Sequence, residues 1–252
     1  MPIIGVINQK GGVGKTTTAV NLAAALAERR RILLVDLDPQ ANASSGLGIR
    51  TPLRTVYDVF SGRASARQAL MRTAQANLAV LPASGDLAGA AVELDATADN
   101  MLLLSRGLMG VRPNFDFIVV DAPPSMGALT LNALAAADHL IIPLQCEYYA
   151  LEGIAGMMDT VERVRGSLNR ELRILGILLT MFDSRTKLSQ QVEENVRRHF
   201  RREVFRTVIP RSVRLAEAPS YGQPVLEYAP MSPGALAYQS LAEEVIDRVS
   251  QG

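Results

Sequence analysis

The segment that most constrains the fold lies near the N-terminus, at residues 9–17, and reads Gln-Lys-Gly-Gly-Val-Gly-Lys-Thr-Thr. It follows a β-branched run at residues 3–7 and opens a helix-forming stretch at residues 16–29. Glycines here permit backbone angles that a Cβ forbids, so successive N–H groups can converge at the helix N-terminus. This order of strand, glycine-rich turn and helix predicts a phosphate-binding loop rather than an ordinary turn.

Short β-branched runs alternate with longer helical stretches along the rest of the chain. The runs lie at residues 32–36, 117–121, 139–143, 172–180 and 206–209. Two of them, Ile-Leu-Leu-Val-Asp and Phe-Ile-Val-Val-Asp, are continuously apolar, as is typical of parallel strands covered on both faces. The pattern predicts an α/β fold, with a doubly wound, mostly parallel sheet flanked by helices on both faces.

The length of 252 residues and the hydrophobic content of 48% favour a single domain over residues 1–252. Residues 84–110 are rich in Ala, Leu and Gly and are expected to form a covering helical layer. Ser232-Pro233 has the form of a cap and first turn, which predicts a terminal helix ending near Val249.

Charge and cysteine content exclude several classes of protein. A net charge of +1 gives no global indication of a nucleic-acid or membrane partner, so any basic surface must be local. Cys146 is the single cysteine and cannot form an intrachain disulfide framework, which fits a reducing cytoplasm. The N-terminus has no basic leader, and no apolar run reaches the roughly 18 residues that span a bilayer. We expect a soluble, unexported protein.

Each residue type in the loop has an expected role with a nucleotide and its metal. Lys15 should reach the β- and γ-phosphates, and the Thr16 hydroxyl should bind Mg²⁺. Thr17, one residue further into the helix, is placed to contact the α-phosphate. The backbone groups expected to hold the phosphates belong to Gly11, Gly12, Val13 and Gly14.

The loop departs from the common pattern Gly-x-x-x-x-Gly-Lys-Thr at its first residue. Gln9 stands where that pattern has glycine, and Lys10 adds a second cation. One triphosphate in one subunit does not need both lysines, so Lys10 is predicted to reach the ligand of another subunit in a nucleotide-sandwich homodimer. The alternative is a solvated loop lysine.

Three aspartates are expected to gather at the same edge of the sheet, because ligands of open parallel sheets bind beyond the carboxyl ends of the strands. Asp36 and Asp38 lie two apart, so one can belong to the metal shell while the other faces an attacking water. Asp121 is expected to bind Mg²⁺ directly or through a water. The alternative for Asp36 and Asp121 is strand-end capping.

Three motifs resemble the deviant Walker A ATPases and, within them, the chromosomal ParA/Soj type: Lys-Gly-Gly-Val-Gly-Lys-Thr-Thr, Asp-Leu-Asp-Pro-Gln at residues 36–40, and Asp-Ala-Pro-Pro-Ser at residues 121–125. The resemblance continues through residues 147–153, 180–186 and 209–220, so it covers essentially the whole chain. It implies an ATP- and Mg²⁺-dependent ATPase whose activity is weak without a partner.

The resemblance also implies roles for individual residues. Lys10 would cross to the partner's phosphates, Asp38 would position the hydrolytic water, and Glu147 would contact the nucleotide across the dimer. The adenine-side wall would be formed by Met181, Phe182, Pro210 and Arg211.

Residues 185–214 carry nine lysines and arginines against three glutamates, a local basic excess that suits a phosphate backbone. By resemblance Arg185 and Arg214 bind duplex DNA without sequence preference. A cluster that could extend this surface consists of Arg197, Arg198, Arg201 and Arg202. The alternative is a solvated helix face. Base stacking is not expected of this surface.

These expectations combine into an ATP-bound dimer that binds DNA and is released by hydrolysis, which a ParB-like centromere-binding protein stimulates. Such a protein would be cytoplasmic and nucleoid-associated, and would segregate a chromosome or plasmid. The alternative is a MinD-like membrane-surface ATPase, or one that positions cargo on a protein scaffold. The mixed, acid-containing C-terminal segment makes a poor membrane anchor, and a single cysteine excludes the nitrogenase-type reductases.

Overall fold

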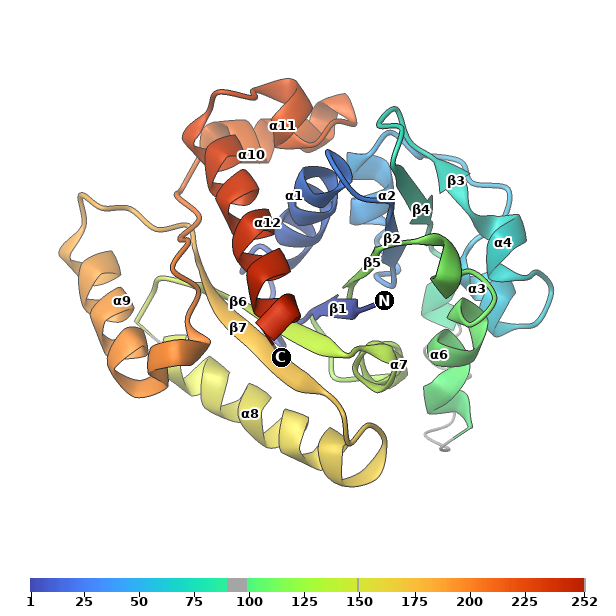
Figure 1. Ribbon diagram of the computed structural model, residues 1–252, viewed down its shortest axis with the longest axis horizontal. Coiled ribbons are helices and arrows are strands. Elements are labelled where there is room, and N and C mark those ends of the chain that lie inside the picture. The colour runs from blue at the N-terminus through green and yellow to red at the C-terminus, as the bar shows by residue number, and fades with distance from the viewer. Residues whose placement is uncertain (90–98, 149, 252) are drawn as a thin grey trace.

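A seven-stranded sheet forms the centre of the computed structural model, which describes residues 1–89, 99–148 and 150–251. The strand order is β3-β4-β2-β5-β1-β6-β7 (Figure 1). The strands are β1 (Ile3–Val6), β2 (Ile32–Asp36), β3 (Met71–Arg72), β4 (Leu78–Leu81), β5 (Phe117–Asp121), β6 (His139–Gln145) and β7 (Arg173–Thr180). In this part of the chain every strand pairing is parallel except β3 with β4, which confirms the predicted sheet.

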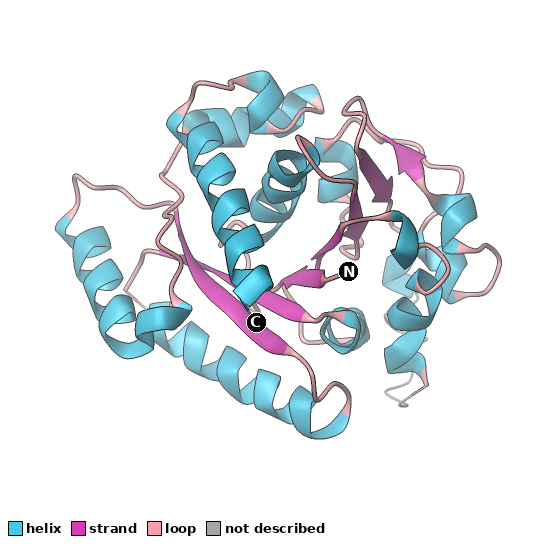
Figure 2. Cartoon of the chain, in the orientation of Figure 1, coloured by secondary structure: helices cyan, strands magenta, loops and turns pink. Residues whose placement is uncertain are grey.

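Helices cover both faces of the sheet, and Figure 2 shows the strands running between them. They are α1 (Lys15–Ala27), α2 (Asn42–Gly46), α3 (Val56–Phe60), α4 (Ala66–Ala69), η1 (Asn100–Leu102), α6 (Leu103–Leu108), η2 (Arg112–Asn114), α7 (Ala128–Ala136), α8 (Ala150–Ser167), α9 (Lys187–Phe200), η3 (Arg201–Glu203), α10 (Val213–Glu217), η4 (Ala218–Tyr221), α11 (Val225–Tyr228) and α12 (Pro233–Gln251).

Successive side chains of a strand pack into two different hydrophobic cores, one on each face of the sheet. Ile3 and Leu33 pack with side chains of α3, α6, α7, α8 and α9, whereas Ile4 and Leu34 pack with α1 and α12 on the other face. Because successive side chains of a strand point to opposite faces, a strand covered on both must be apolar throughout. This is why the continuous runs at β2 and β5 predict both strands with their observed bounds.

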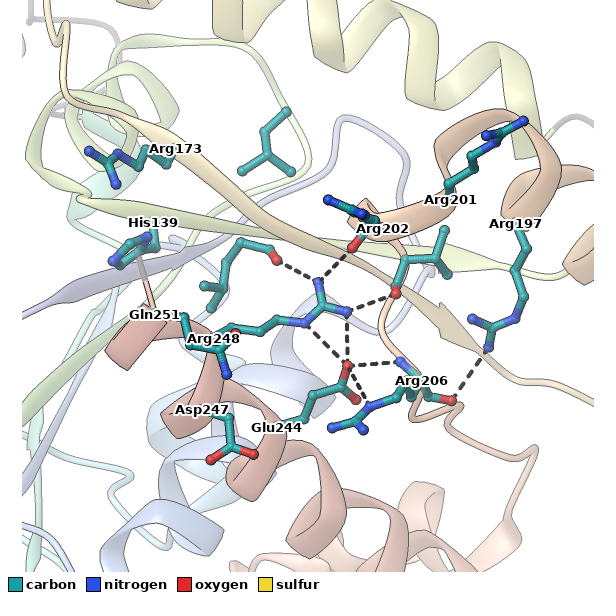
Figure 3. A pocket seen from close by; sticks show the side chains of 13 residues that line it. His139, Arg173, Arg197, Arg201, Arg202, Arg206, Glu244, Asp247, Arg248 and Gln251 are labelled. Carbon is teal, nitrogen blue, oxygen red and sulfur yellow. Dashed lines mark hydrogen bonds and ion pairs between the residues drawn. The ribbon is translucent and has the colours of Figure 1, made fainter.

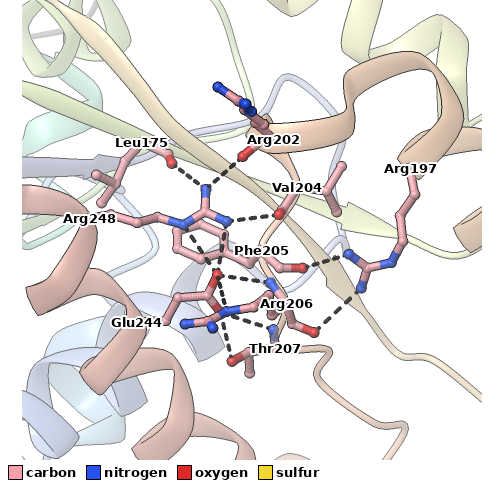
Figure 4. A network of polar contacts seen from close by, with 9 residues as sticks. All are labelled: Leu175, Arg197, Arg202, Val204, Phe205, Arg206, Thr207, Glu244 and Arg248. Atoms are coloured by element: carbon pink, nitrogen blue, oxygen red, sulfur yellow. Dashed lines mark hydrogen bonds and ion pairs between the residues drawn. The ribbon is translucent and has the colours of Figure 1, made fainter. Parts of the chain in front are cut away.

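Residues 206–209 do not form the strand predicted for them. Two backbone donors there, Arg206 N and Thr207 N, bond to the carboxylate of Glu244 on α12, at 2.9 and 3.0 Å (Figure 4). The segment still follows β7, since Phe205 N and Ile209 N donate to carbonyls of that strand. A buried glutamate thus takes the place of part of a strand ladder.

Outcomes differ among the remaining segments. The short strands β3 and β4 were not expected. Of the helical layer predicted at residues 84–110, η1 and α6 are helical as expected, and residues 90–98 lie outside the described residues. The terminal helix is confirmed and reaches Gln251. No helix in the described ranges is long and apolar enough to cross a membrane.

Glu244 is the residue whose loss should destabilise this part of the fold most. Its side chain is 5% exposed and also accepts hydrogen bonds from Arg248 and the Thr207 hydroxyl. Burial alone would raise the pKa of Glu244, but these hydrogen bonds outweigh it and lower the pKa below its ordinary value. Glu244→Gln should therefore reduce the free energy of unfolding at pH 7 by about 3 kcal/mol, because it leaves Arg248 without its buried partner.

Denaturant unfolding at several pH values checks this prediction. A depressed carboxylate pKa contributes stability that is present above the unfolded pKa and is lost as pH falls through the folded one. The difference between the parent protein and Glu244→Gln should therefore shrink in acid. A difference that stays constant down to pH 3 would contradict this account.

Candidate nucleotide site

The glycine loop turns at two residues with left-handed backbone angles before α1 begins. Gly12 has φ 77° and Gly14, the residue before the first turn of α1, has φ 88°. A Cβ built on Gly11 or Gly12 would meet no described atom within 4 Å, so both residues face open space. Backbone N–H groups at an open helix N-terminus are suited to phosphate oxygens.

Lys15 lies buried behind this loop. Its Nζ donates to the carbonyl oxygen of Lys10 at 2.9 Å, which folds the loop over the lysine stem. Burial lowers the pKa of Lys15 below its usual value, while Asp121 and Asp38 act in the opposite direction. The lysine charge therefore sits between the open loop and the acids of the neighbouring strands.

Asp121 is fully buried, and no hydrogen bond of normal geometry from the described residues reaches either of its carboxylate oxygens, although the Thr16 side chain lies close enough to lower its pKa. Burial raises the pKa of Asp121 well above its ordinary range, and the nearby Asp36 raises it further. A buried carboxylate without donors is costly unless a cation or water satisfies it. Oxygen ligands are those that Mg²⁺ prefers, so Asp121 beside Thr16 fits a magnesium ion.

Asp36 lies opposite Asp121 in the register of β2 and β5, but the Asp36 carboxylate has hydrogen-bond donors of its own. Its Oδ2 accepts from the Ser44 N–H and hydroxyl, each at 2.8 Å, and its Oδ1 accepts from Asp38 N at 3.1 Å. Burial raises the pKa of Asp36 to about 6. With these contacts Asp36 fixes the connection from β2 to α2, which favours the strand-end capping alternative over a place in the metal shell.

Asp38 lines the same pocket as the glycine loop. Its Oδ1 accepts from Gln40 N at 2.9 Å, and no described donor contacts its Oδ2. The pocket has a volume of about 670 Å³. Its lining includes Gly11, Gly12, Gly14, Lys15, Thr16, Thr17, Asp38, Pro39, Gln40, Asn42 and Pro123–Ser125. The loop, the first turn of α1 and one free carboxylate oxygen therefore face one space.

A smaller, more apolar pocket of about 210 Å³ adjoins the loop. Met181, Pro210 and Arg211 line it, as expected of a base-binding wall. Phe182 holds the two segments together, because its N–H donates to Ile209 O and its carbonyl accepts from Arg211 N, both at 3.0 Å. Phe182 thus supports this wall from outside the lining.

The contacts of two polar residues in this region could not be predicted from the sequence. Thr180 lies at the end of β7 and donates from its hydroxyl to Val13 O at 2.9 Å. Tyr238 on α12 is 1% exposed, and its hydroxyl lies 3.2 Å from the Thr18 hydroxyl on α1. A tyrosine followed by a glutamine in a terminal helix is ordinary in sequence, so only the packing of α12 on α1 reveals the contact.

Lys10 does not point at the pocket of its own subunit. Its Nζ forms an ion pair with Glu147, which follows β6, and the two side chains are 49% and 34% exposed. The adjacent Gln9 donates to the Thr160 hydroxyl on α8 at 3.2 Å. In the isolated chain the two residues predicted to act across a dimer therefore hold each other.

Several known proteins are similar to this chain in sequence. Residues 1–174 match a family model described as an AAA domain. Sporulation initiation inhibitor protein Soj of Bacillus subtilis is 52% identical over 246 residues, covering 96% of this chain and 97% of that protein. Chromosome-partitioning ATPase Soj of Thermus thermophilus is 54% identical over 251 residues, covering 98% of this chain and 96% of that protein. The chain belongs to the ParA/Soj family of chromosome-partitioning ATPases.

Solved structures extend the ParA/Soj comparison to the fold. Cobyrinic acid a,c-diamide synthase from Mycobacterium smegmatis, with bound ADP and magnesium, is 38% identical with a TM-score of 0.86, covering 100% of this chain and 96% of that one. The cell division ATPase MinD of Pyrococcus furiosus is 29% identical with a TM-score of 0.82, covering 98% of each chain. Both likenesses agree with the parallel sheet found here.

The arginines that the ParA/Soj resemblance assigns to DNA fall into two places. The contacts of Phe182 bring residues 181–186 beside residues 209–214, which carry Arg185 and Arg214. These two side chains are 85% and 58% exposed and pair only with local acids, Asp183 and Glu217. Both are therefore exposed side chains on segments that adjoin the base-side wall.

The remaining arginines lie on α9 and in the turn that follows it. Arg197 and Arg198 pair with glutamates one turn earlier on α9, and Arg197 also donates to two backbone carbonyls. Arg201 and Arg202 follow the far end of α9, whose 14 residues span about 20 Å. The proposed DNA surface rests on Arg185 and Arg214, and a contribution from Arg197, Arg198, Arg201 or Arg202 stays a prediction.

Proposed function

We propose that this chain is a Mg²⁺-dependent ATPase that works as a DNA-partitioning switch. ATP would close two subunits into a sandwich dimer that binds duplex DNA, and hydrolysis, stimulated by a ParB-like partner on the nucleoid, would release it. The observation that carries the proposal is one pocket that unites the open glycine loop, Lys15, Thr16 and Asp38 beside the unsatisfied carboxylate of Asp121.

Different residues of the chain would bind the phosphates, the base and the metal ion of Mg²⁺-ATP. The loop N–H groups and Lys15 would hold the phosphates, and Met181, Pro210 and Arg211 would enclose the base. Thr16 and Asp121 would hold Mg²⁺, which when bound neutralises charge on the transferred phosphoryl group. Asp38 would orient the attacking water through the oxygen that accepts no hydrogen bond from the described residues.

Hydrolysis by one subunit alone should be slow. No arginine is among the described residues that line the phosphate pocket. Transferred phosphoryl groups need positive charge beyond the binding lysine to be stabilised in the transition state. Lys10 of a second subunit would supply such a charge, and in doing so would leave Glu147.

A test of the metal assignment uses Asp121→Asn. Because the substitution removes a carboxyl group whose ionised form is disfavoured by burial, the nucleotide-free protein should gain about 1 kcal/mol in the free energy of unfolding. Affinity for Mg²⁺-ATP should nevertheless fall by at least about tenfold, the loss that follows when even an outer partner of a metal site is removed. Calorimetric titration and denaturant unfolding measure the two effects. A variant that loses stability and keeps its affinity would refute the assignment.

A test of the DNA surface uses Arg185→Glu combined with Arg214→Glu. The double variant should still dimerise with ATP but bind a random duplex at least about 100-fold more weakly, because each dimer loses four phosphate contacts. The slope of log affinity against log salt should become shallower by about 3 to 4. Both are measured by fluorescence anisotropy with ATP, ADP and no nucleotide.

A matched control for this test is Arg29→Glu with Arg170→Glu, which changes the net charge equally at exposed sites at the opposite edge of the sheet. It should keep most of the DNA affinity. Equal losses in both double variants would show that net charge alone is responsible. ATP-dependent binding to anionic liposomes, with none to DNA, would instead favour the membrane-surface alternative.

A further inference from the structure

A second pocket, of about 600 Å³, lies at the opposite edge of the sheet from the nucleotide site. His139 and Arg173, which pair in the register of β6 and β7, stand at the amino ends of those strands and line it (Figure 3). The glycine loop follows the carboxyl end of β1. The two pockets therefore face different sides of the molecule and share no lining residue.

The lining of this second pocket is strongly basic. Burial lowers the pKa of His139 below its ordinary value, which disfavours the charged form of its ring. The acids that line the pocket are Glu244 and Asp247. The arginines that line it are Arg173, Arg197, Arg201, Arg202, Arg206 and Arg248. Six cations thus face two acids.

One of those two acids, Glu244, is already paired with groups of the surrounding fold. Arg248 donates to Glu244 at 2.8 Å, to three backbone carbonyls, and stacks over the Phe205 ring at 4.2 Å (Figure 4). A Cβ at Gly176 would lie 2.6 Å from that ring, so the glycine in β7 is needed for this packing. Glu244 also binds two backbone N–H groups, which leaves it little capacity to neutralise other arginines.

Among the described residues, the arginines of the lining that remain available for a ligand are Arg201, Arg202 and Arg206, and the Arg201 side chain points away from the other two (Figure 3). Arg202 donates from its guanidinium to no described residue, and Arg206 is 82% exposed with only a 3.8 Å approach to Glu244. The turn that places them begins at Arg201, whose φ of 34° and ψ of −98° are unfavourable for a residue with a Cβ. Such strain is commonly kept where a site requires a particular backbone course.

We propose that this pocket binds a small phosphorylated anion of diphosphate size or larger, which Arg202 and Arg206 hold above the Arg248–Glu244 floor. Guanidinium groups bind phosphate oxygens in pairs of parallel hydrogen bonds, and several together select multiply charged anions. The volume is that of a small-molecule site. Because the site is concave, a free phosphorylated molecule fits it better than the convex backbone of duplex DNA.

Equilibrium dialysis with trace radiolabelled pyrophosphate tests the proposal. The parent protein is saturated with Mg²⁺-ADP, so that the nucleotide site is filled, and about one pyrophosphate per subunit should still bind. Arg202→Gln combined with Arg206→Gln should weaken that binding by about tenfold or more. Arg29→Gln with Arg170→Gln, two exposed arginines at the same edge outside the lining, should leave it unchanged.

A second arm separates the two sites. Lys15→Ala without nucleotide should retain pyrophosphate binding, since the lysine is remote from the arginine pocket. Loss of binding in Lys15→Ala, or an equal loss in both arginine pairs, would overturn the proposal. The proposal would also be overturned if the parent protein bound no pyrophosphate and Arg202→Gln with Arg206→Gln lost only its affinity for duplex DNA. The arginines would then serve DNA binding.

Discussion

Lys10→Ala should abolish ATP-dependent dimers while nucleotide affinity changes by no more than a few-fold. The Lys10 side chain does not line its own phosphate pocket and instead pairs with Glu147. Removing a charge that is buried between two subunits commonly costs several kcal/mol, so the dimer should weaken by about 100-fold. Light scattering with ATP and Mg²⁺, together with nucleotide titration of the same preparation, measures both quantities.

Glu147→Gln provides the matched comparison for Lys10→Ala. It frees Lys10 from its partner in the same subunit and keeps the side-chain volume. If the ion pair competes with the dimer, dimers should form at lower ATP concentration. If Glu147 contacts the partner's nucleotide, as the resemblance implies, dimers should weaken instead. Unchanged dimerisation of Lys10→Ala would contradict the sandwich under either outcome.

Asp38→Ala should lower the rate of hydrolysis by roughly 100-fold or more, the usual contribution of a positioned acid or base. The variant should still bind ATP and dimerise, since the loop, Lys15 and Asp121 are untouched. With hydrolysis blocked, it should stay on DNA after free ATP is removed, and a filter-binding time course measures this. Asp38→Asn is the control that keeps the hydrogen bond from Gln40 N without the charge. Hydrolysis at the parental rate in Asp38→Ala would refute the assigned role.

The different roles of Asp36 and Asp121 could not be predicted from the sequence. Asp36 and Asp121 both end continuous apolar strands and are both fully buried, so the pattern treats them alike. Ser44 distinguishes them, because its N–H and hydroxyl occupy Asp36 and leave Asp121 unsatisfied. A serine eight residues further along the chain carries no signal of that contact.

Contacts between distant segments account for the other differences. β2 and β5 were predictable because burial on both faces imposes a continuous apolar run. The predicted strand at residues 206–209 fails because Glu244, 37 or 38 residues later, takes two of its donors. The pairing of Lys10 with Glu147, 137 residues apart, likewise follows only from the placement of β6 beside β1.

The central claim is that Lys10 acts in the site of the other subunit, and mixing two inactive variants tests it most directly. Lys10→Ala and Asp38→Ala subunits are combined before ATP is added, and hydrolysis is followed. In a mixed dimer the Lys10→Ala subunit keeps its own Asp38 and receives Lys10 from its partner, so one site is complete. The mixture should recover up to about a quarter of the parental rate. That limit applies if half of the dimers are mixed and each has one working site, and it is approached from below because a mixed dimer lacks one of its two Lys10 side chains. A mixture no more active than the separate variants would contradict the claim, because a lysine acting within its own subunit leaves no complete site in any dimer.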